Sequence, residues 1–416
     1  MTDLFATDPE AARILEAELE RQQNTLVLIA SENYASPAVL AAQGSIFANK
    51  YAEGYVGKRY YNGCENMDAI EQLCIDRAKV LFGCEHVNAQ AHAGAQANTA
   101  VYQALLQPGD RILSLELAHG GHLTHGMRLN VSGQLYEISH YGVGRESGRI
   151  DMDEVERLAH ETKPKLLLFG ASAYPRHFEV ARFRAIADQV GAYLMADMAH
   201  VMGLIAGGAH PDPVPYCDVV TFTTHKTMRG PRGGMILCRE QYAKDIDRAV
   251  FPGQQGGPFM HNVMGKAVML AEAATPAYRD YAQQVVTNAA AMAEVLVEAG
   301  YKLVSGGTDN HLMLVDLTPQ DITGKDAANA LDAAGICLNK NGIPFDTRSP
   351  MVTSGIRLGT PALTTRGFSA AECSEVARLI VEVLGDLQSD TVRQRVRARA
   401  AELCAAHPLY TDYLDR

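Results

Sequence analysis

A lysine and an aspartate follow two successive apolar runs of the chain, and together they could do carbonyl chemistry. Lys226 lies within Thr223–Thr227, directly after the apolar run 218–222, and Asp197 directly follows the run 192–196. A partly desolvated lysine amine can form a Schiff base with an aldehyde. A carboxylate one strand away can pair with a pyridinium nitrogen. The pair therefore indicates pyridoxal phosphate (PLP) chemistry, although a lysine at a strand end is most often simply solvated.

Two further segments could bind the charged ends of a ligand. Small residues at 93–98 open a helix after the strand-like run 86–91, and the free N–H groups of such a turn can bind phosphate. An ordinary strand-to-helix turn is the alternative. Arg357 lies in the Gly- and Thr-rich stretch 353–361, which suits a bidentate clamp on a carboxylate, with an ordinary surface arginine as the alternative.

Three histidines at a spacing of three, His119, His122 and His125, could suggest a metal site. On a helix the first and last would point about 120° apart, and the two glycines between them favour a loop. The sequence places no carboxylate or cysteine nearby to complete a ligand set. We therefore predict no metal. An imidazole stacked on a flat ring is the better functional interpretation, and a purely structural role is the alternative.

Strands and helices are expected to alternate from residue 67 to residue 270, with strands at 86–91, 112–117, 166–169, 192–196 and 218–222. This order predicts a doubly wound, mostly parallel α/β domain, in which ligands lie beyond the carboxyl ends of the strands. We expect a large domain over 1–275 and a smaller α+β domain over 276–416. Residues 1–7 are expected to be a loose arm before a helix capped by Asp8, and Ser369 begins a capping box.

Composition narrows the function classes. The 416 residues carry a formal net charge of −11, which disfavours nonspecific nucleic-acid binding. The eight cysteines form no C-x-x-C pair, and no run approaches the roughly 18 apolar residues of a membrane span. Without a basic and apolar leader, a cytoplasmic protein is expected. The spacing of Gly142 and Gly144 does not fit a dinucleotide fingerprint, which argues against a nicotinamide enzyme.

Taken together, the segments closely resemble serine hydroxymethyltransferases, PLP enzymes of fold type I. The resemblance covers nearly the whole chain. Its specific motifs are residues 28–33 (LIASEN), 49–55 (NKYAEGY), 118–126 (AHGGHLTHG), 223–227 (TTHKT), 229–234 (RGPRGG) and 354–357 (SGIR).

The resemblance implies a complete cofactor site. Lys226 would hold PLP as a Schiff base, Asp197 would pair with the pyridinium nitrogen, and His122 would stack on the ring. Ser172 and His200 would contact the ring hydroxyl and the region of the substrate carboxylate. The phosphate contacts would come from Gly94, Ala95 and Gln96 and, from the neighbouring subunit, Tyr51 and Gly257.

It also implies a homodimer whose chains share substrate and folate sites. Arg357 and Ser31 would bind the amino-acid carboxylate. Glu53 of the neighbour would be the acid–base group, beside Tyr61. Tetrahydrofolate would meet Leu117, Gly121, Leu123 and Asn341, while His225 and Thr223 complete the predicted catalytic set. The implied reaction transfers the hydroxymethyl carbon of L-serine to tetrahydrofolate, giving glycine and 5,10-methylenetetrahydrofolate.

Some positions depart from the family pattern. Ala93 replaces a usual serine, which removes a hydroxyl contact to the phosphate worth about 1 kcal/mol. Phe222, Met202 and Val56 also depart. They leave open a specialised member acting on 2-methylserine, or a folate-independent aldolase or transaldolase for 3-hydroxy amino acids, which Glu53 argues against. A non-catalytic RNA-binding or scaffolding role is disfavoured by the charge and by the lysine–aspartate pair.

Overall fold

The computed structural model describes residues 2–411 and 413, and these form two compact units. One unit is residues 33–283, and the other joins residues 1–32 to residues 284–416. The boundary at 283 lies inside the long helix α12, Pro276–Glu298. The domain boundary at residue 275, which we expect from the sequence, stays a prediction.

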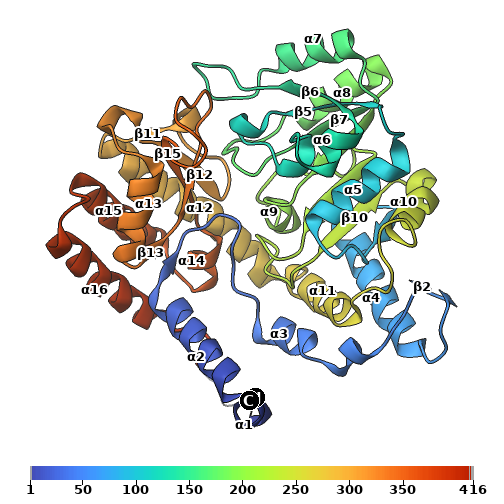
Figure 1. Ribbon diagram of the computed structural model, residues 1–416, viewed down its shortest axis with the longest axis horizontal. Coiled ribbons are helices and arrows are strands. Elements are labelled where there is room, and N and C mark those ends of the chain that lie inside the picture. Colours follow the sequence, from blue (N-terminus) through green and yellow to red (C-terminus); the bar gives the residue numbers. More distant parts are fainter. Residues whose placement is uncertain (1, 412, 414–416) are drawn as a thin grey trace. The chain divides into compact units, whose positions relative to one another are not determined.

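A mixed sheet forms the centre of the unit of residues 33–283 (Figure 1). Its strands are β4 (His86–Asn88), β5 (Arg111–Leu115), β6 (Glu137–Tyr141), β7 (Leu166–Gly170), β8 (Tyr193–Asp197), β9 (Val219–Thr223) and β10 (Gly234–Cys238). Among the described residues it has seven strands in the order β4-β10-β9-β8-β7-β5-β6. The pairs from β9 to β6 are parallel, whereas β10 is antiparallel to both of its neighbours.

Helices cover both faces of this sheet, which explains why β7, β8 and β9 are almost wholly buried. On one face α5 (Gly94–Leu105) and α10 (Ala243–Val250) share an apolar cluster with the strands. On the other, α8 (Val180–Val190) stacks Phe183 on Phe169 of β7, with ring centroids 4.7 Å apart. The predicted doubly wound, mostly parallel fold is therefore confirmed.

The remaining elements of this unit surround the sheet. They are α3 (Pro37–Gln43), the short hairpin β2 (Gly54–Tyr55) and β3 (Lys58–Arg59), α4 (Glu65–Phe82), α6 (Val131–Leu135), α7 (Met152–Thr162), α9 (Met202–Ala206) and α11 (Met260–Ala273). The expected strands match β5, β7, β8 and β9 closely, but β4 ends at Asn88, not at residue 91. Strands β6 and β10 were not predicted.

The other unit is an α+β layer around a four-stranded antiparallel sheet, β11-β12-β15-β14, within the described residues. Its elements are α1 (Thr2–Thr7), α2 (Pro9–Asn24), β1 (Leu26–Val27), β11 (Lys302–Leu303), β12 (Leu312–Asp316), α13 (Gly324–Ala333), β13 (Ile336–Cys337), β14 (Asn339–Asn341), β15 (Gly355–Gly359), α14 (Pro361–Thr365), α15 (Ala370–Gly385) and α16 (Asp390–Ala406). Strand β1 joins the unit by parallel pairing with β13.

The helix ends of this unit follow the sequence signals, with one exception. Asp8 caps α2 by accepting a hydrogen bond from the Ala11 amide, and Ser369 and Glu372 form the capping box of α15. The expectation of a loose arm at residues 1–7 is wrong, because Thr2–Thr7 form helix α1. None of the described helices is long and apolar enough to cross a membrane.

Candidate active site

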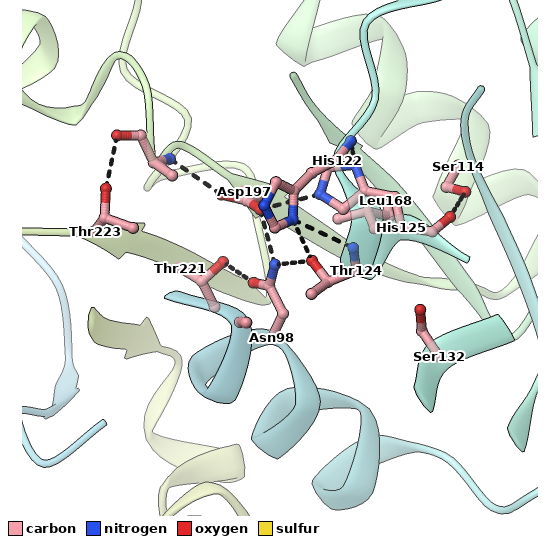
Figure 2. A network of polar contacts seen from close by, with 12 residues as sticks. Asn98, Ser114, His122, Thr124, His125, Ser132, Leu168, Asp197, Thr221 and Thr223 are labelled. Carbon is pink, nitrogen blue, oxygen red and sulfur yellow. Dashed lines mark hydrogen bonds and ion pairs between the residues drawn. The ribbon is translucent and has the colours of Figure 1, made fainter. Parts of the chain in front are cut away.

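A buried carboxylate at the carboxyl end of β8 is the centre of the polar network in Figure 2. Asp197 is 7% exposed, and its Oδ2 accepts hydrogen bonds from His125 Nε2 at 3.0 Å and from Asn98 Nδ2 at 2.8 Å. Burial opposes ionisation, but the hydrogen bonds from His125 and Asn98 help to hold the pKa of Asp197 well below its usual value. The carboxylate therefore stays ionised at neutral pH.

A chain of side chains continues from this carboxylate to His122. Asn98 on α5 also donates to Thr124 Oγ1 at 2.8 Å and accepts from Thr221 Oγ1 at 2.6 Å. Thr124 contacts His122 Nδ1 through its hydroxyl, at 2.7 Å, and its amide, at 3.2 Å. We infer that the ring hydrogen of His122 is on Nε2, because Nδ1 accepts the Thr124 amide. Burial lowers the pKa of His122 to about 4, so the ring is uncharged near pH 7.

The same network corrects one step of the sequence argument about metals. Donor atoms of His122, His125 and Asp197 lie within 4.8 Å of one another, so a carboxylate does join the histidines in space. Asp197 is 72 residues from His125 along the chain, which is why the sequence motif did not reveal it. Since Asp197 Oδ2 already accepts two hydrogen bonds, we interpret the cluster as a hydrogen-bond network.

The segment that carries Lys226 is fixed to the end of β8 by two threonines. Thr223 Oγ1 donates to the Ala199 carbonyl at 3.1 Å, and Thr227 Oγ1 donates to the His200 carbonyl at 2.9 Å. The Lys226 carbonyl accepts a hydrogen bond from Asn33 Nδ2 at 3.0 Å. The backbone on both sides of Lys226 is thus held against the segment that follows Asp197.

The residues beside Lys226 have constrained environments as well. Burial, followed by the charges of Arg232 and Lys226, lowers the pKa of His225 to about 3, so His225 is uncharged near neutral pH. Arg229 has a left-handed backbone, with φ of 56°, and its guanidinium lies over the ring of Tyr281, 4.4 Å from the centroid. This cation–π contact closes the turn that follows Lys226.

The helix start predicted to bind phosphate has a suitable shape. Helix α5 begins at Gly94, and Ala93 at its N-cap position has no polar side-chain atom to cap the first amides. A Cβ on Gly94 would lie 2.6 Å from Thr223 Cγ2, so the turn lies directly against the end of β9. The first N–H groups of the helix, which include those of Ala95 and Gln96, and the positive end of its dipole suit a dianionic phosphate.

The loop predicted to meet folate lies beside the same edge of the sheet. The Ser172 amide donates to the Gly120 carbonyl at 2.8 Å, which joins the loop after β7 to the loop after β5. A Cβ on Gly121 would lie 2.3 Å from the Leu115 carbonyl oxygen, so a side chain there would force the loop apart. Leu117 and Leu123 are 43% and 49% exposed, which leaves apolar surface open to a flat ligand.

A second group of predicted site residues gathers around the tyrosine-rich hairpin. The rings of Tyr51 and Tyr61 meet edge to face with centroids 5.5 Å apart. A Cβ on Gly257 would lie 3.2 Å from Tyr51 Cε1, and one on Gly256 would lie 3.2 Å from Glu53 Oε1. The negative charge of Glu53 raises the pKa of Tyr61. Tyr51 and Tyr61 are 58% and 46% exposed, so the two rings face outward, whereas Glu53 is half-buried.

The predicted carboxylate-binding residues belong to the other unit. Arg357 lies on β15 opposite Asn339, and its Nε donates to Asn339 Oδ1 at 3.2 Å. Burial lowers the pKa of Arg357 to about 10, so the guanidinium is still charged at neutral pH. Ser31 and Asn341 are both half-buried in this unit, and Asn341 lies on β14 next to β15.

Sequence reasoning missed three residues that hold this site. Asn98 and His125 bind Asp197, and Asn33 binds the Lys226 carbonyl. Asn98 could have been found, because it lies one helical turn after Gly94 on the helix that opens the phosphate turn. The sequence motif offers His125 only as one of three possible metal ligands, and it places Asn33 in the segment 28–33 without indicating a partner.

An ionised aspartate one strand away from a lysine, at the carboxyl edge of a doubly wound sheet, is how fold-type I PLP enzymes are built. Comparison with known proteins gives the family. The sequence model of serine hydroxymethyltransferase matches residues 4–380. A curated relative from Myxococcus xanthus (strain DK1622), named serine hydroxymethyltransferase, is 56% identical over 411 residues, which cover 99% of this chain and 98% of the relative. The chain belongs to the serine hydroxymethyltransferase family.

Proposed function

We propose that this chain is a PLP-dependent hydroxymethyltransferase that transfers the hydroxymethyl carbon of L-serine to tetrahydrofolate, giving glycine and 5,10-methylenetetrahydrofolate. One observation carries the proposal. Buried Asp197 is held by hydrogen bonds, and the segment that contains Lys226 is bound by its threonines to the residues that follow Asp197. Family membership supports the same reaction. When bound, PLP supplies an electron sink for the electrons left behind when the side-chain carbon departs.

The residues around Asp197 and Lys226 are suited to hold that cofactor. Lys226 would bind its aldehyde carbon, and ionised Asp197 would keep the ring nitrogen protonated. Uncharged His122 would cover one face of the ring, and Ser172 and His200 would lie at its polar edge. The backbone amides of Gly94, Ala95 and Gln96 would bind the phosphate.

We assign the substrate side to Arg357 and Ser31 for the amino-acid carboxylate, and to exposed Leu117 and Leu123, with Gly121 and Asn341, for tetrahydrofolate. Glu53 would move a proton at the substrate hydroxyl, with Tyr61, Thr223 and His225 in the catalytic set. The outward-facing cluster of Tyr51, Glu53 and Gly257 suggests that these residues complete the site of a second chain in a homodimer.

L-Serine is favoured over a specialised substrate by where two departures from the family pattern lie. Phe222 and Met202 are both 0% exposed. Phe222 meets Phe82 edge to face, with ring centroids 5.5 Å apart, and so fills the space between the sheet and α4. Both side chains are therefore part of the packed core, where a change of side-chain volume affects the stability of the fold before it affects the choice of substrate.

The test is glycine formation from L-serine by the purified protein, with and without tetrahydrofolate, beside 2-methylserine and L-threonine. We expect fast turnover of L-serine that depends on folate. Slow serine turnover with fast, folate-independent cleavage of another 3-hydroxy amino acid would contradict the proposal.

Replacing the proposed cofactor lysine tests the other half of the proposal. We expect Lys226→Ala to abolish the visible absorption band that the wild-type protein gains with PLP, and to abolish folate-dependent turnover. Lys244, an exposed lysine on α10, provides the control, since Lys244→Ala should leave both unchanged. An unaltered band in Lys226→Ala would sink the assignment.

A further inference from the structure

A buried lysine outside the predicted site lies behind the phosphate turn. Lys266 on α11 is 2% exposed, and its Nζ donates to three backbone carbonyls. The acceptors are Ala89 at 2.7 Å, Ala91 at 3.0 Å and Gly234 at 2.9 Å. An ammonium has three N–H donors, so all of them are used on backbone.

Two of these carbonyls belong to the segment that leads into the phosphate turn. Strand β4 ends at Asn88, so residues 89–92 lie between the end of this strand and the phosphate turn. Lys266 binds the odd-numbered carbonyls of this segment. Gln255 binds the even-numbered positions, because it donates to the Gln90 carbonyl at 2.9 Å and accepts from the His92 amide at 3.0 Å. The two side chains together bind backbone groups of all four residues of this segment.

The third acceptor of Lys266, the Gly234 carbonyl, connects this side chain to the phosphate turn at the start of α5. The Gly234 amide donates to the Ala91 carbonyl at 3.1 Å. A Cβ on Gly234 would lie 2.6 Å from the Ala93 carbonyl oxygen and 3.0 Å from the Gly94 nitrogen. Gly234 therefore packs directly against the N-terminus of α5, and Lys266 fixes both strands on which that turn rests.

We propose that Lys266 is a positioning residue for the phosphate end of the cofactor, holding the turn into α5 in shape and placing a buried positive charge behind it. The inference rests on the proposed function, since it takes the start of α5 as the phosphate site. A displaced phosphate turn would weaken the binding of the phosphate group specifically. A general loss of packing would weaken the contacts to the phosphate and to the ring of the cofactor alike.

The charge on Lys266 changes within a pH range in which ligand binding can be measured. Burial lowers its pKa to about 8, while the facing groups Cys74 and Glu71 on α4 oppose that shift. Desolvation and the charge of Lys266 lower the pKa of His92 on the other side. Lys266 is thus mostly an ammonium at pH 7 and loses its proton as the pH rises towards 9. A bound phosphate dianion would favour the charged form, so the phosphate contribution to affinity should fall over that rise.

The experiment compares the dissociation constants (Kd) of PLP and of pyridoxal, which lacks the phosphate, for wild type and Lys266→Met. We expect the preference for PLP over pyridoxal to fall roughly tenfold in the variant, the effect of losing one charge-assisted interaction. Arg366→Met is the matched control. Arg366 is also a buried cation that donates to backbone carbonyls, at 2.9 Å to Gln23 and 2.8 Å to Cys404, but it lies in the other unit. That variant should lower the melting temperature without changing the preference.

An unchanged preference in folded Lys266→Met, with both dissociation constants raised equally, would overturn the inference in favour of a purely structural role. If the variant does not fold, the same comparison is made on the wild-type protein. Its preference for PLP over pyridoxal should decrease between pH 7 and pH 9, and a constant ratio of the two dissociation constants would overturn the inference. A wild-type protein that gains no visible band with PLP would instead refute the proposed function.

Discussion

The charge on Asp197 depends on the neutral amide that faces it. Asn98 is 2% exposed, and both ends of its side-chain amide make hydrogen bonds. Its Nδ2 donates to Asp197 and Thr124, and its Oδ1 accepts from the Thr221 hydroxyl. An isosteric carboxylate at this position would face Asp197 at hydrogen-bond distance. Two buried carboxylates cannot both ionise there without strong repulsion.

We therefore predict that Asn98→Asp lowers the free energy of unfolding by about 2 kcal/mol or more, and that PLP binds less tightly. The loss should grow from pH 5 to pH 8, because a shared proton relieves the pair at low pH and is lost as the pH rises. Urea unfolding at several pH values measures this. Asn130→Asp is the control, since Asn130 caps α6 and a carboxylate suits a helix N-terminus. A loss in Asn98→Asp that does not vary with pH would argue against like-charge repulsion as the cause.

At the scale of elements, a buried ion pair anchors the hairpin that carries Tyr51, Glu53 and Tyr61. Arg59 on β3 pairs with Glu71 and Asp68 of α4, and its Nη1 donates to the Ala52 and Gly54 carbonyls at 3.0 and 2.9 Å. Glu71 is 1% exposed and also accepts from Gln90 Nε2 at 2.7 Å. Gln90 is itself bound by Gln255, so the hairpin and the segment leading to the phosphate turn share one network.

Removing Arg59 should therefore affect both stability and the hairpin. We predict that Arg59→Ala lowers the free energy of unfolding by roughly 3–5 kcal/mol, because Glu71 is left as a buried charge. Hydrogen exchange of residues 50–63 should accelerate more than that of the sheet. The double variant Arg59→Met, Glu71→Met should regain most of the stability, and the control Arg157→Ala, which breaks an exposed helix pair, should change it by less than about 1 kcal/mol. A double variant no more stable than Arg59→Ala would contradict this account.

The same elements show why part of the fold could be predicted and part could not. Strands β7, β8 and β9 are mostly apolar, and β8 and β9 end in Asp197 and Thr223, so both the strand positions and the placement of Asp197 and Lys226 at one edge followed from the sequence. Strand β10 was missed because it follows a Gly-rich turn without a separating helix. The contacts of Asn98 and Lys266 were also missed, because they join residues 99 and up to 177 positions apart, and only the folded chain brings these together.

At the scale of the whole molecule, we propose that the site takes residues from two chains. Thr223, at the end of β9, binds the segment after Asp197 and lies against the phosphate turn, whereas exposed Tyr51 lies beside Gly257 in a second cluster, together with half-buried Glu53. In a symmetric dimer each cluster would complete the site of the partner. This arrangement makes an inactive variant of one cluster able to rescue an inactive variant of the other.

We predict that Lys226→Ala and Glu53→Gln are each inactive alone, but regain about one quarter of wild-type activity when coexpressed in equal amounts. Random pairing makes half of the dimers mixed, and each mixed dimer has one site with both defects and one with neither. Coexpression with two affinity tags, followed by the folate-dependent serine assay, measures the effect: the unfractionated mixture should have about one quarter of wild-type activity, and the doubly tagged mixed dimers about one half. Lys226→Ala with Asp197→Asn is the matched control, because both residues belong to the same cluster and no mixed dimer would contain an intact site. Equal activity from the two mixtures would mean that each site is built from a single chain, and the outward-facing cluster would then need another explanation.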